Sequence, residues 1–147
     1  MEIRPFREQD EEELIRLWRA CGLVVPWNDP AEDIRRKLRV RREWFLVGLL
    51  EGRIAASVMA GYDGHRGWVY YLAVDSARRR SGLGRRMMEE AERLLLAEGC
   101  PKINLQVRRS NAEAVGFYEG IGYAEDDVVS FGKRLIPDLP EGEAAGG

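Results

Sequence analysis

Five of the nine residues from Arg78 to Arg86 are arginine, and glycines lie among them at positions 82 and 84. The whole chain has a formal net charge of −2, so this concentration of positive charge is local. Glycine lets a backbone approach an anion closely, and guanidinium groups donate forked hydrogen bonds to phosphate oxygens. The segment therefore predicts an anion site, with a solvated basic surface as the alternative.

The elements around this segment favour the anion site. A strand rich in aromatic and branched residues is predicted from Trp68 to Val74, and an amphipathic helix from about Gly82 to Glu98. The first amides of a helix lack partners within it and carry the positive end of its dipole. The segment contains neither a Walker phosphate loop nor a dinucleotide-binding glycine fingerprint, so these two motifs do not identify the anion.

Apolar periodicity and turn residues predict the other elements. They are an edge strand at 2–6, a helix at 10–21 begun by a capping pair of Asp10 and Glu13, a helix begun by Asp29-Pro30, a hairpin of strands at 44–50 and 54–61, a strand at 102–107, a short helix capped by Ser110, and a last strand at 128–135. The strands first form a meander and then cross over through a helix. This order predicts an α/β fold with a mixed sheet and helices on both faces.

Composition limits the class of protein. The 147 residues, 45% hydrophobic and 33% charged, predict a single domain at 1–136 followed by a flexible acidic tail at 137–147. No apolar run approaches the ~20 residues that a membrane-spanning helix needs, so we expect a cytoplasmic protein without membrane contact. The two cysteines, Cys21 and Cys100, have no disulfide or metal-site spacing and are expected to be reduced, with no metal bound. The slightly acidic charge argues against nucleic acid as a partner.

Two blocks of sequence resemble the GCN5-related N-acetyltransferase (GNAT) family. Arg79 to Gly84 resembles its motif A, which is Gln or Arg, two residues of any type, Gly, one of any type, then Gly or Ala. Asn111 to Tyr123 is similar to its pattern N-x-x-A-x-x-x-Y-x-x-x-G followed by Phe or Tyr. The resemblance covers about residues 1–136, and the segments 26–30 and 61–67 look like the YpeA-like subgroup.

The resemblance implies the GNAT acyl-CoA N-acyltransferase fold, a largely antiparallel sheet with a central pair of parallel strands that splay apart. Acetyl-CoA would lie between the strands ending near Val74 and Val107, as co-substrate of an acetyl-CoA-dependent N-acetyltransferase that acetylates an amine on a small molecule or a protein. Separately from the resemblance, an exposed last strand at 128–135 would support a homodimer. The cofactor-binding residues implied by the motif match are Leu72, Val74, Arg79, Arg80, Gly82, Leu83, Gly84, Arg85 and Asn111.

The resemblance also implies that Tyr118 is the general acid for the leaving thiolate; the alternative is a core aromatic residue. No carboxylate lies in the strand from Trp68 to Val74. The general base is therefore Asp63, His65, or a water chain toward Tyr70 or main-chain carbonyls. Three further residues either line the acceptor side or are structural: Trp27, Asn28 and Tyr62. The missing carboxylate leaves a non-catalytic acyl-CoA-binding regulatory module as the alternative function.

Overall fold

The computed structural model describes residues 1–138. The chain forms two compact units, and each is described here by itself. The first comprises residues 1–104 together with Asp138, and it contains the whole sheet. The second comprises residues 105–137 and contains one helix, α4 (Ala112–Gly120).

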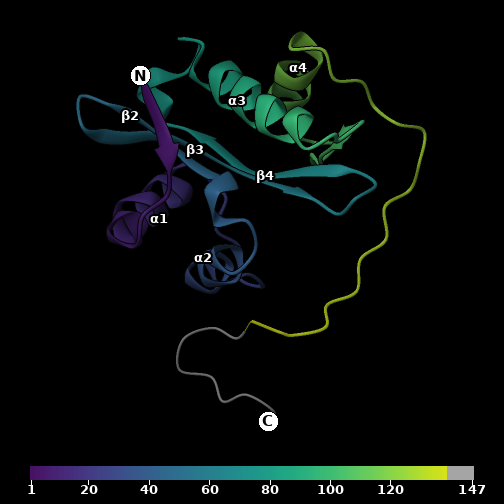
Figure 1. The fold of residues 1–147 in the computed structure, drawn as a ribbon, viewed down its shortest axis with the longest axis horizontal. Coiled ribbons are helices and arrows are strands. Elements are labelled where there is room, and N and C mark those ends of the chain that lie inside the picture. Colours follow the sequence, from purple (N-terminus) through teal and green to yellow (C-terminus); the bar gives the residue numbers. More distant parts are fainter. Residues whose placement is uncertain (139–147) are drawn as a thin grey trace. The chain divides into compact units, whose positions relative to one another are not determined.

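The sheet of the first unit has five strands in sequential order (Figure 1). They are β1 (Glu2–Pro5), β2 (Phe45–Leu50), β3 (Arg53–Tyr62), β4 (Gly67–Val74) and β5 (Ile103–Asn104). Neighbours from β1 to β4 are antiparallel, and β4 pairs with β5 in parallel. The mixed sheet is confirmed, and the strand with Pro5 lies at the sheet edge, where a residue without an N–H is tolerated.

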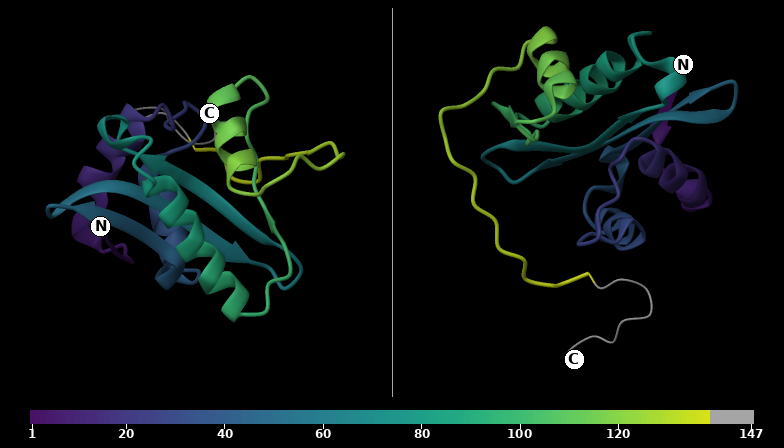
Figure 2. Two further views of the ribbon diagram at one scale, coloured as in Figure 1. Left: turned by 90° about the horizontal axis from the view of Figure 1, so that it is seen from above. Right: turned by 180° about the vertical axis from the view of Figure 1, so that it is seen from behind.

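Helices cover both faces of this sheet, as predicted (Figures 1 and 2). The helices α1 (Glu11–Ala20) and α2 (Pro30–Leu38) lie on one face, and α3 (Leu83–Ala97) lies on the other. Three short 3-10 turns complete the unit: η1 (Glu8–Asp10), η2 (Arg42–Trp44) and η3 (Ser76–Arg78). None of the helices among residues 1–138 is long and apolar enough to cross a membrane.

The core on the α1 and α2 side is built around aromatic rings. Trp18 is fully buried, and its ring stacks on Phe45 with centroids 6.2 Å apart and on Tyr71 with centroids 3.9 Å apart. On the other face, α3 buries a stripe of apolar residues that includes Leu83, Met87, Ala91 and Leu95. Cys21 is half-buried and Cys100 is buried, and neither is in a disulfide.

Two predicted strands differ from those observed. The strand expected at 102–107 is only Ile103–Asn104, and residues 128–135 form no strand in the described part of the chain. Side chains in that last segment, such as Val128 and Phe131, are 76% and 93% exposed. Apolar residues with strand propensity form a strand only when a neighbouring strand supplies the ladder of hydrogen bonds, which propensity alone does not show. The parallel pair therefore lies at the edge of the sheet instead of its centre.

Two predicted helix caps are also wrong. The helix α4 is capped by Asn111, whose Oδ1 accepts from the amide of Ala114 at 3.1 Å, and not by Ser110. Asp10 makes no cap bond to α1, because its carboxylate accepts from the Arg4 guanidinium and from the amide of Arg7 at 2.8 Å. Burial opposes ionisation of Asp10, but these hydrogen bonds outweigh burial and lower its pKa. Of the predicted tail at 137–147, residues 139–147 lie outside the described residues.

Candidate active site

The arginine-rich turn connects the end of β4 to the start of α3. Asp75 begins it, because its Oδ1 accepts from the amide of Ala77 at 3.1 Å and holds the turn η3. The backbone then takes left-handed conformations at Arg80, with φ of 67°, and at Gly82, with φ of 83°. Glycine adopts this conformation without strain, which explains the residue type at position 82.

The start of α3 has no side-chain cap. Gly82 is the capping residue and contributes no side chain, and the helical ladder begins with the amide of Arg86 donating to the Gly82 carbonyl at 3.1 Å. Among residues 1–138, no side chain accepts from the amides of residues 83–85. These three donors are therefore available to an anion at the positive end of the helix dipole.

The arginines at this turn differ in their contacts. Arg78, Arg79 and Arg80 are exposed, and within residues 1–138 their side chains have no hydrogen-bond or ion-pair partner. Arg85 pairs loosely with Glu89 at 3.6 Å, and Arg86 donates to the Met1 carbonyl at 3.3 Å. Three guanidinium groups thus remain free to bind phosphate oxygens beside the open amides.

The strand β4 contains a bulge that sequence analysis did not predict. Ser57 of β3 pairs with Ala73 and Met59 pairs with Tyr70, so the single residue between them on β3 opposes both Tyr71 and Leu72. Tyr71 has a φ of 53°, in the left-handed region that is rare for an aromatic residue. A bulge of this kind interrupts the ladder and changes the direction of the strand.

Buried polar contacts surround the bulge. The indole Nε1 of Trp18 donates to Ser57 Oγ at 2.9 Å, and this hydroxyl donates to the Tyr71 carbonyl at 2.8 Å. The Tyr71 hydroxyl in turn donates to Asp33 Oδ2 at 2.6 Å. The only sequence signal for this arrangement was Ser57, a polar residue inside an otherwise apolar strand.

The pairing of β4 with β5 ends before the bulge, because β5 ends at Asn104. The ladder between the two strands contains only Gly67 with Ile103 and Trp68 with Asn104, although β4 continues to Val74. Leu72 and Val74 lie on the part of β4 that has no β5 partner, and the Val74 carbonyl accepts from the Cys21 thiol at 3.3 Å.

The candidate bases lie at the opposite end of β4. Asp63 and His65 belong to the turn before Gly67, and Val74 lies seven residue steps further along the strand, about 23 Å away. Asp63 Oδ1 accepts from the amides of Arg66 and His65, each at 2.8 Å. These hydrogen bonds, Arg66 first, lower the pKa of Asp63 and make it a weaker base. His65 is exposed.

The candidate acceptor-side residues have mixed surroundings. Trp27 is 55% exposed, and the amide of Asn28 donates to the Val25 carbonyl at 3.1 Å in the loop before α2. The Tyr62 hydroxyl donates to the Gly64 carbonyl at 3.3 Å, within the same turn as Asp63. Tyr70 is 52% exposed, and its pKa is raised by burial and by the charge of Asp63.

Asn111 and Tyr118 belong to the second unit. The Tyr118 ring meets Phe117 and Tyr123 edge-on, with centroids 5.1 and 5.8 Å away, and burial raises the pKa of Tyr118 to about 12. The structure therefore brings Leu72, Val74 and the arginine turn together in one unit, and Asn111 and Tyr118 together in the other. No group of His, Cys, Asp and Glu residues suited to a metal ion occurs within 1–138.

The chain is similar to known acetyltransferases in sequence. A profile of the acetyltransferase (GNAT) family matches residues 10–123. An acetyltransferase of Yersinia enterocolitica is 49% identical over 138 residues, covering 94% of this chain and 98% of that protein.

Solved structures agree in fold. The ribosomal-protein-S18-alanine N-acetyltransferase from Escherichia coli has a TM-score of 0.71 and 25% identity, over 85% of this chain and 78% of that chain. AAC(6′)-Iy, in complex with the bisubstrate analogue CoA-S-monomethyl-acetylneamine, has a TM-score of 0.73 and 15% identity, over 90% and 97% of the two chains. With its profile match, its 49% identical relative and this shared fold, the chain belongs to the acetyltransferase (GNAT) family.

Proposed function

We propose that this protein is an acetyl-CoA-dependent N-acetyltransferase, which transfers the acetyl group directly to an amine. The observation that carries the proposal is the start of α3, where open amides follow Gly82 and three unpaired arginines lie beside them. Family membership supplies the identity of the anion, because an acetyltransferase needs an acetyl donor and the donor of this family carries a pyrophosphate.

In this proposal the pyrophosphate binds the amides of residues 83–85, and Arg79 and Arg80 neutralise its charge. Helix amides and guanidinium groups together suit an anion that carries two phosphates. The pantetheine arm follows β4 past the bulge, where Leu72 and Val74 have no β5 partner. The amide group of Asn111 contacts the same arm while its Oδ1 caps α4.

The reaction in this proposal is one direct transfer. The amine nitrogen attacks the thioester carbonyl carbon, a C–N bond forms, and the C–S bond breaks with its electron pair moving to sulfur. The Tyr118 hydroxyl donates to the developing thiolate, and the amine gives its proton to water. A pKa of about 12 keeps the Tyr118 phenol protonated at neutral pH. Asp63 takes no step, because the backbone amides of Arg66 and His65 bind its Oδ1, lower its pKa and make it a weak base.

Isothermal titration with acetyl-CoA, followed by an assay of thiol release over a panel of amines, tests the function. The panel contains aminoglycosides and peptides with free amino termini, because both kinds of acceptor appear in the names of structural relatives. We expect micromolar binding, and thiol release that requires an amine. No binding at these concentrations would contradict the proposal, and binding without transfer to any amine would indicate the regulatory module instead.

A separate variant tests Tyr118. Tyr118→Phe should lower kcat by about 100-fold and leave the Kd for acetyl-CoA within about twofold, because general acid catalysis contributes mainly to the transition state. Tyr123→Phe, which removes the hydroxyl of its neighbour, is the matched control. Since the pKa of Tyr118 is raised, the wild-type rate should show no loss from its ionisation below about pH 10. An unchanged kcat in Tyr118→Phe would remove the acid role.

A further inference from the structure

We propose that Asp33 and Tyr71 are positioning residues for the acetyl donor. The hydrogen bond between them holds the bulge of β4, from which the main chain at Leu72 meets the pantetheine arm. This inference rests on the proposed function, because it assumes that acetyl-CoA lies along this part of β4.

The backbone at Tyr71 needs outside support. An aromatic residue disfavours a φ of 53°, so contacts elsewhere in the fold must hold this conformation. Three elements supply them. Trp18 of α1 stacks on the ring, Ser57 of β3 donates to the carbonyl, and Asp33 of α2 accepts from the hydroxyl. Of the three, Asp33 alone holds the outer end of the side chain with a charged acceptor.

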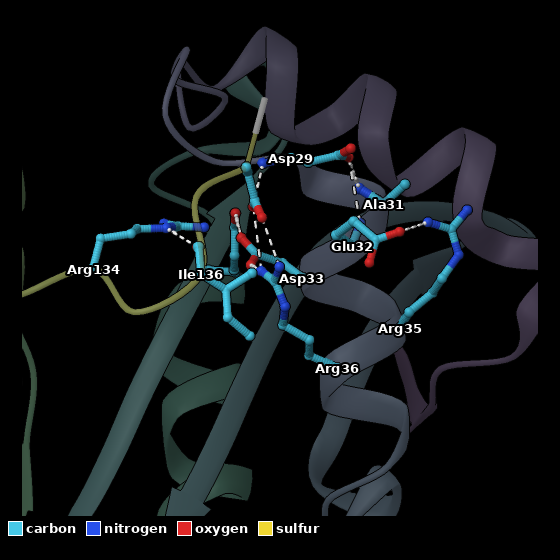
Figure 3. Close-up of polar contacts among 10 residues, drawn as sticks. Asp29, Ala31, Glu32, Asp33, Arg35, Arg36, Arg134 and Ile136 are labelled. Carbon is cyan, nitrogen blue, oxygen red and sulfur yellow. Dashed lines mark hydrogen bonds and ion pairs between the residues drawn. The ribbon is translucent and has the colours of Figure 1, made fainter. Parts of the chain in front are cut away.

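Asp33 is itself held in place by residues distant in sequence (Figure 3). Its Oδ1 accepts from Arg36 Nη1 at 3.2 Å, and Arg36 Nη2 donates to Asp138 Oδ1 at 2.6 Å. Asp138, whose side chain is only 4% exposed, also accepts from the amide of Asp29 at 2.8 Å. This chain of bonds gives the Asp33 carboxylate one orientation, which a positioning residue requires.

The bulge affects ligand binding because it changes which main-chain groups of β4 are free to form hydrogen bonds with other partners. Where two residues oppose one, the extra residue leaves the ladder and its main-chain groups become available to other partners. In a regular strand, Leu72 would instead take a fixed place in the antiparallel hydrogen-bond ladder with β3. Loss of the Asp33–Tyr71 bond should therefore disturb the pantetheine contacts but not the distant pyrophosphate site at the start of α3.

Two ligands separate these effects in a titration experiment. Acetyl-CoA contains both the pyrophosphate and the pantetheine arm, whereas adenosine 3′-phosphate 5′-diphosphate contains only the pyrophosphate end. Tyr71→Phe, which keeps the stacked ring, and Asp33→Ala, which removes the acceptor, should each raise the Kd for acetyl-CoA about tenfold. Both variants should bind the diphosphate fragment as the wild type does. The double variant should lose no more than either single variant, because both remove the same bond.

Glu32→Gln is the matched control, because Glu32 lies on the same helix but pairs with Arg35 on its exposed side. An equal loss for both ligands would overturn the proposal and indicate general destabilisation, and so would an unchanged Kd for acetyl-CoA. If Asp33→Ala fails to fold, Tyr71→Phe still decides the question. A wild type that binds neither ligand refutes the proposed function as well, whereas variants that match a binding wild type refute this inference alone.

Discussion

The helices α2 and α3 begin in opposite ways. At α2, the Asp29 side chain accepts from the amides of Ala31 and Glu32 at 3.0 and 3.3 Å, and Pro30 has no amide hydrogen to satisfy. At α3, Gly82 contributes no side chain, and no described side chain accepts from the amides that follow. The same physical requirement is thus met inside the protein at one helix and left open at the other.

The charged residues in the first turns of α2 and α3 also differ. The first turn of α2 contains Glu32 and Asp33, which the positive end of the helix dipole favours. The first turn of α3 contains no acidic residue and instead has Arg85 and Arg86, which that dipole disfavours. Such an arrangement destabilises the isolated helix slightly and favours an external anion. In our proposal, the start of α2 serves stability and the start of α3 serves ligand binding.

Making the start of α3 resemble that of α2 should have the largest effect. Gly82→Asp places a carboxylate beside the open amides, and the backbone strain of a side chain at a φ of 83° is shared by the control variant Gly82→Asn. Its negative charge should raise the Kd for acetyl-CoA by about 100-fold, since charges a few ångströms apart at a surface repel by a few kcal/mol. Titration calorimetry measures this loss. Gly82→Asn, with a similar shape and no charge, should lose clearly less; equal losses would show that repulsion is not the cause.

Removing one arginine beside the open amides should have a smaller effect. Arg79→Ala should raise the Kd for acetyl-CoA about tenfold, because a charge-assisted hydrogen bond to phosphate contributes about 1.5–3 kcal/mol. The loss should shrink as salt is added, because Arg79 is exposed and screened. Arg35→Ala, on the exposed side of α2, is the control. A loss in both variants would contradict a local role for Arg79.

Removing the internal cap of α2 should instead affect stability. Asp29→Ala should lower the free energy of unfolding by about 1 kcal/mol, the usual cost of losing such a cap. The Kd for acetyl-CoA should stay within about twofold, as determined on the same protein preparation. Denaturant unfolding measures the first quantity, and Asp29→Asn, which retains the cap, should be close to wild type. If Asp29→Ala lost more binding free energy for acetyl-CoA than free energy of unfolding, the start of α2 would not serve stability alone.

The smallest effect on acetyl-CoA binding is expected at α4. Its start has a side-chain cap like that of α2 and, in our proposal, a ligand contact like that of α3. Asn111 caps the helix through Oδ1 and, in our proposal, offers its amide hydrogens to the cofactor. Asn111→Asp keeps the cap and removes that donor, so the Kd should rise about threefold without loss of stability. Calorimetry and thermal unfolding together check this. Unchanged binding would limit Asn111 to capping.

Local features were predicted well because their causes are local. The cap by Asp29 next to Pro30, the hairpin turn at 51–52 and the start of α3 near Gly82 all follow from residues within a few positions. The bulge at Tyr71 was missed because its supports come from three other elements, on Trp18, Ser57 and Asp33. The strand expected at 128–135 was wrong because strand pairing depends on a partner that propensity does not identify.

The sequence alone determined the arginine turn, its glycines and their position between a strand and a helix, because short-range sterics and backbone hydrogen bonding decide these features. It also carried the two motifs that indicated the family. Only the tertiary structure decided which helix start stays open, where the pairing of β4 with β5 ends, and which residues hold Tyr71 in its left-handed conformation. These features depend on contacts between residues as far apart as Arg36 and Asp138, and such contacts form only when distant segments pack together.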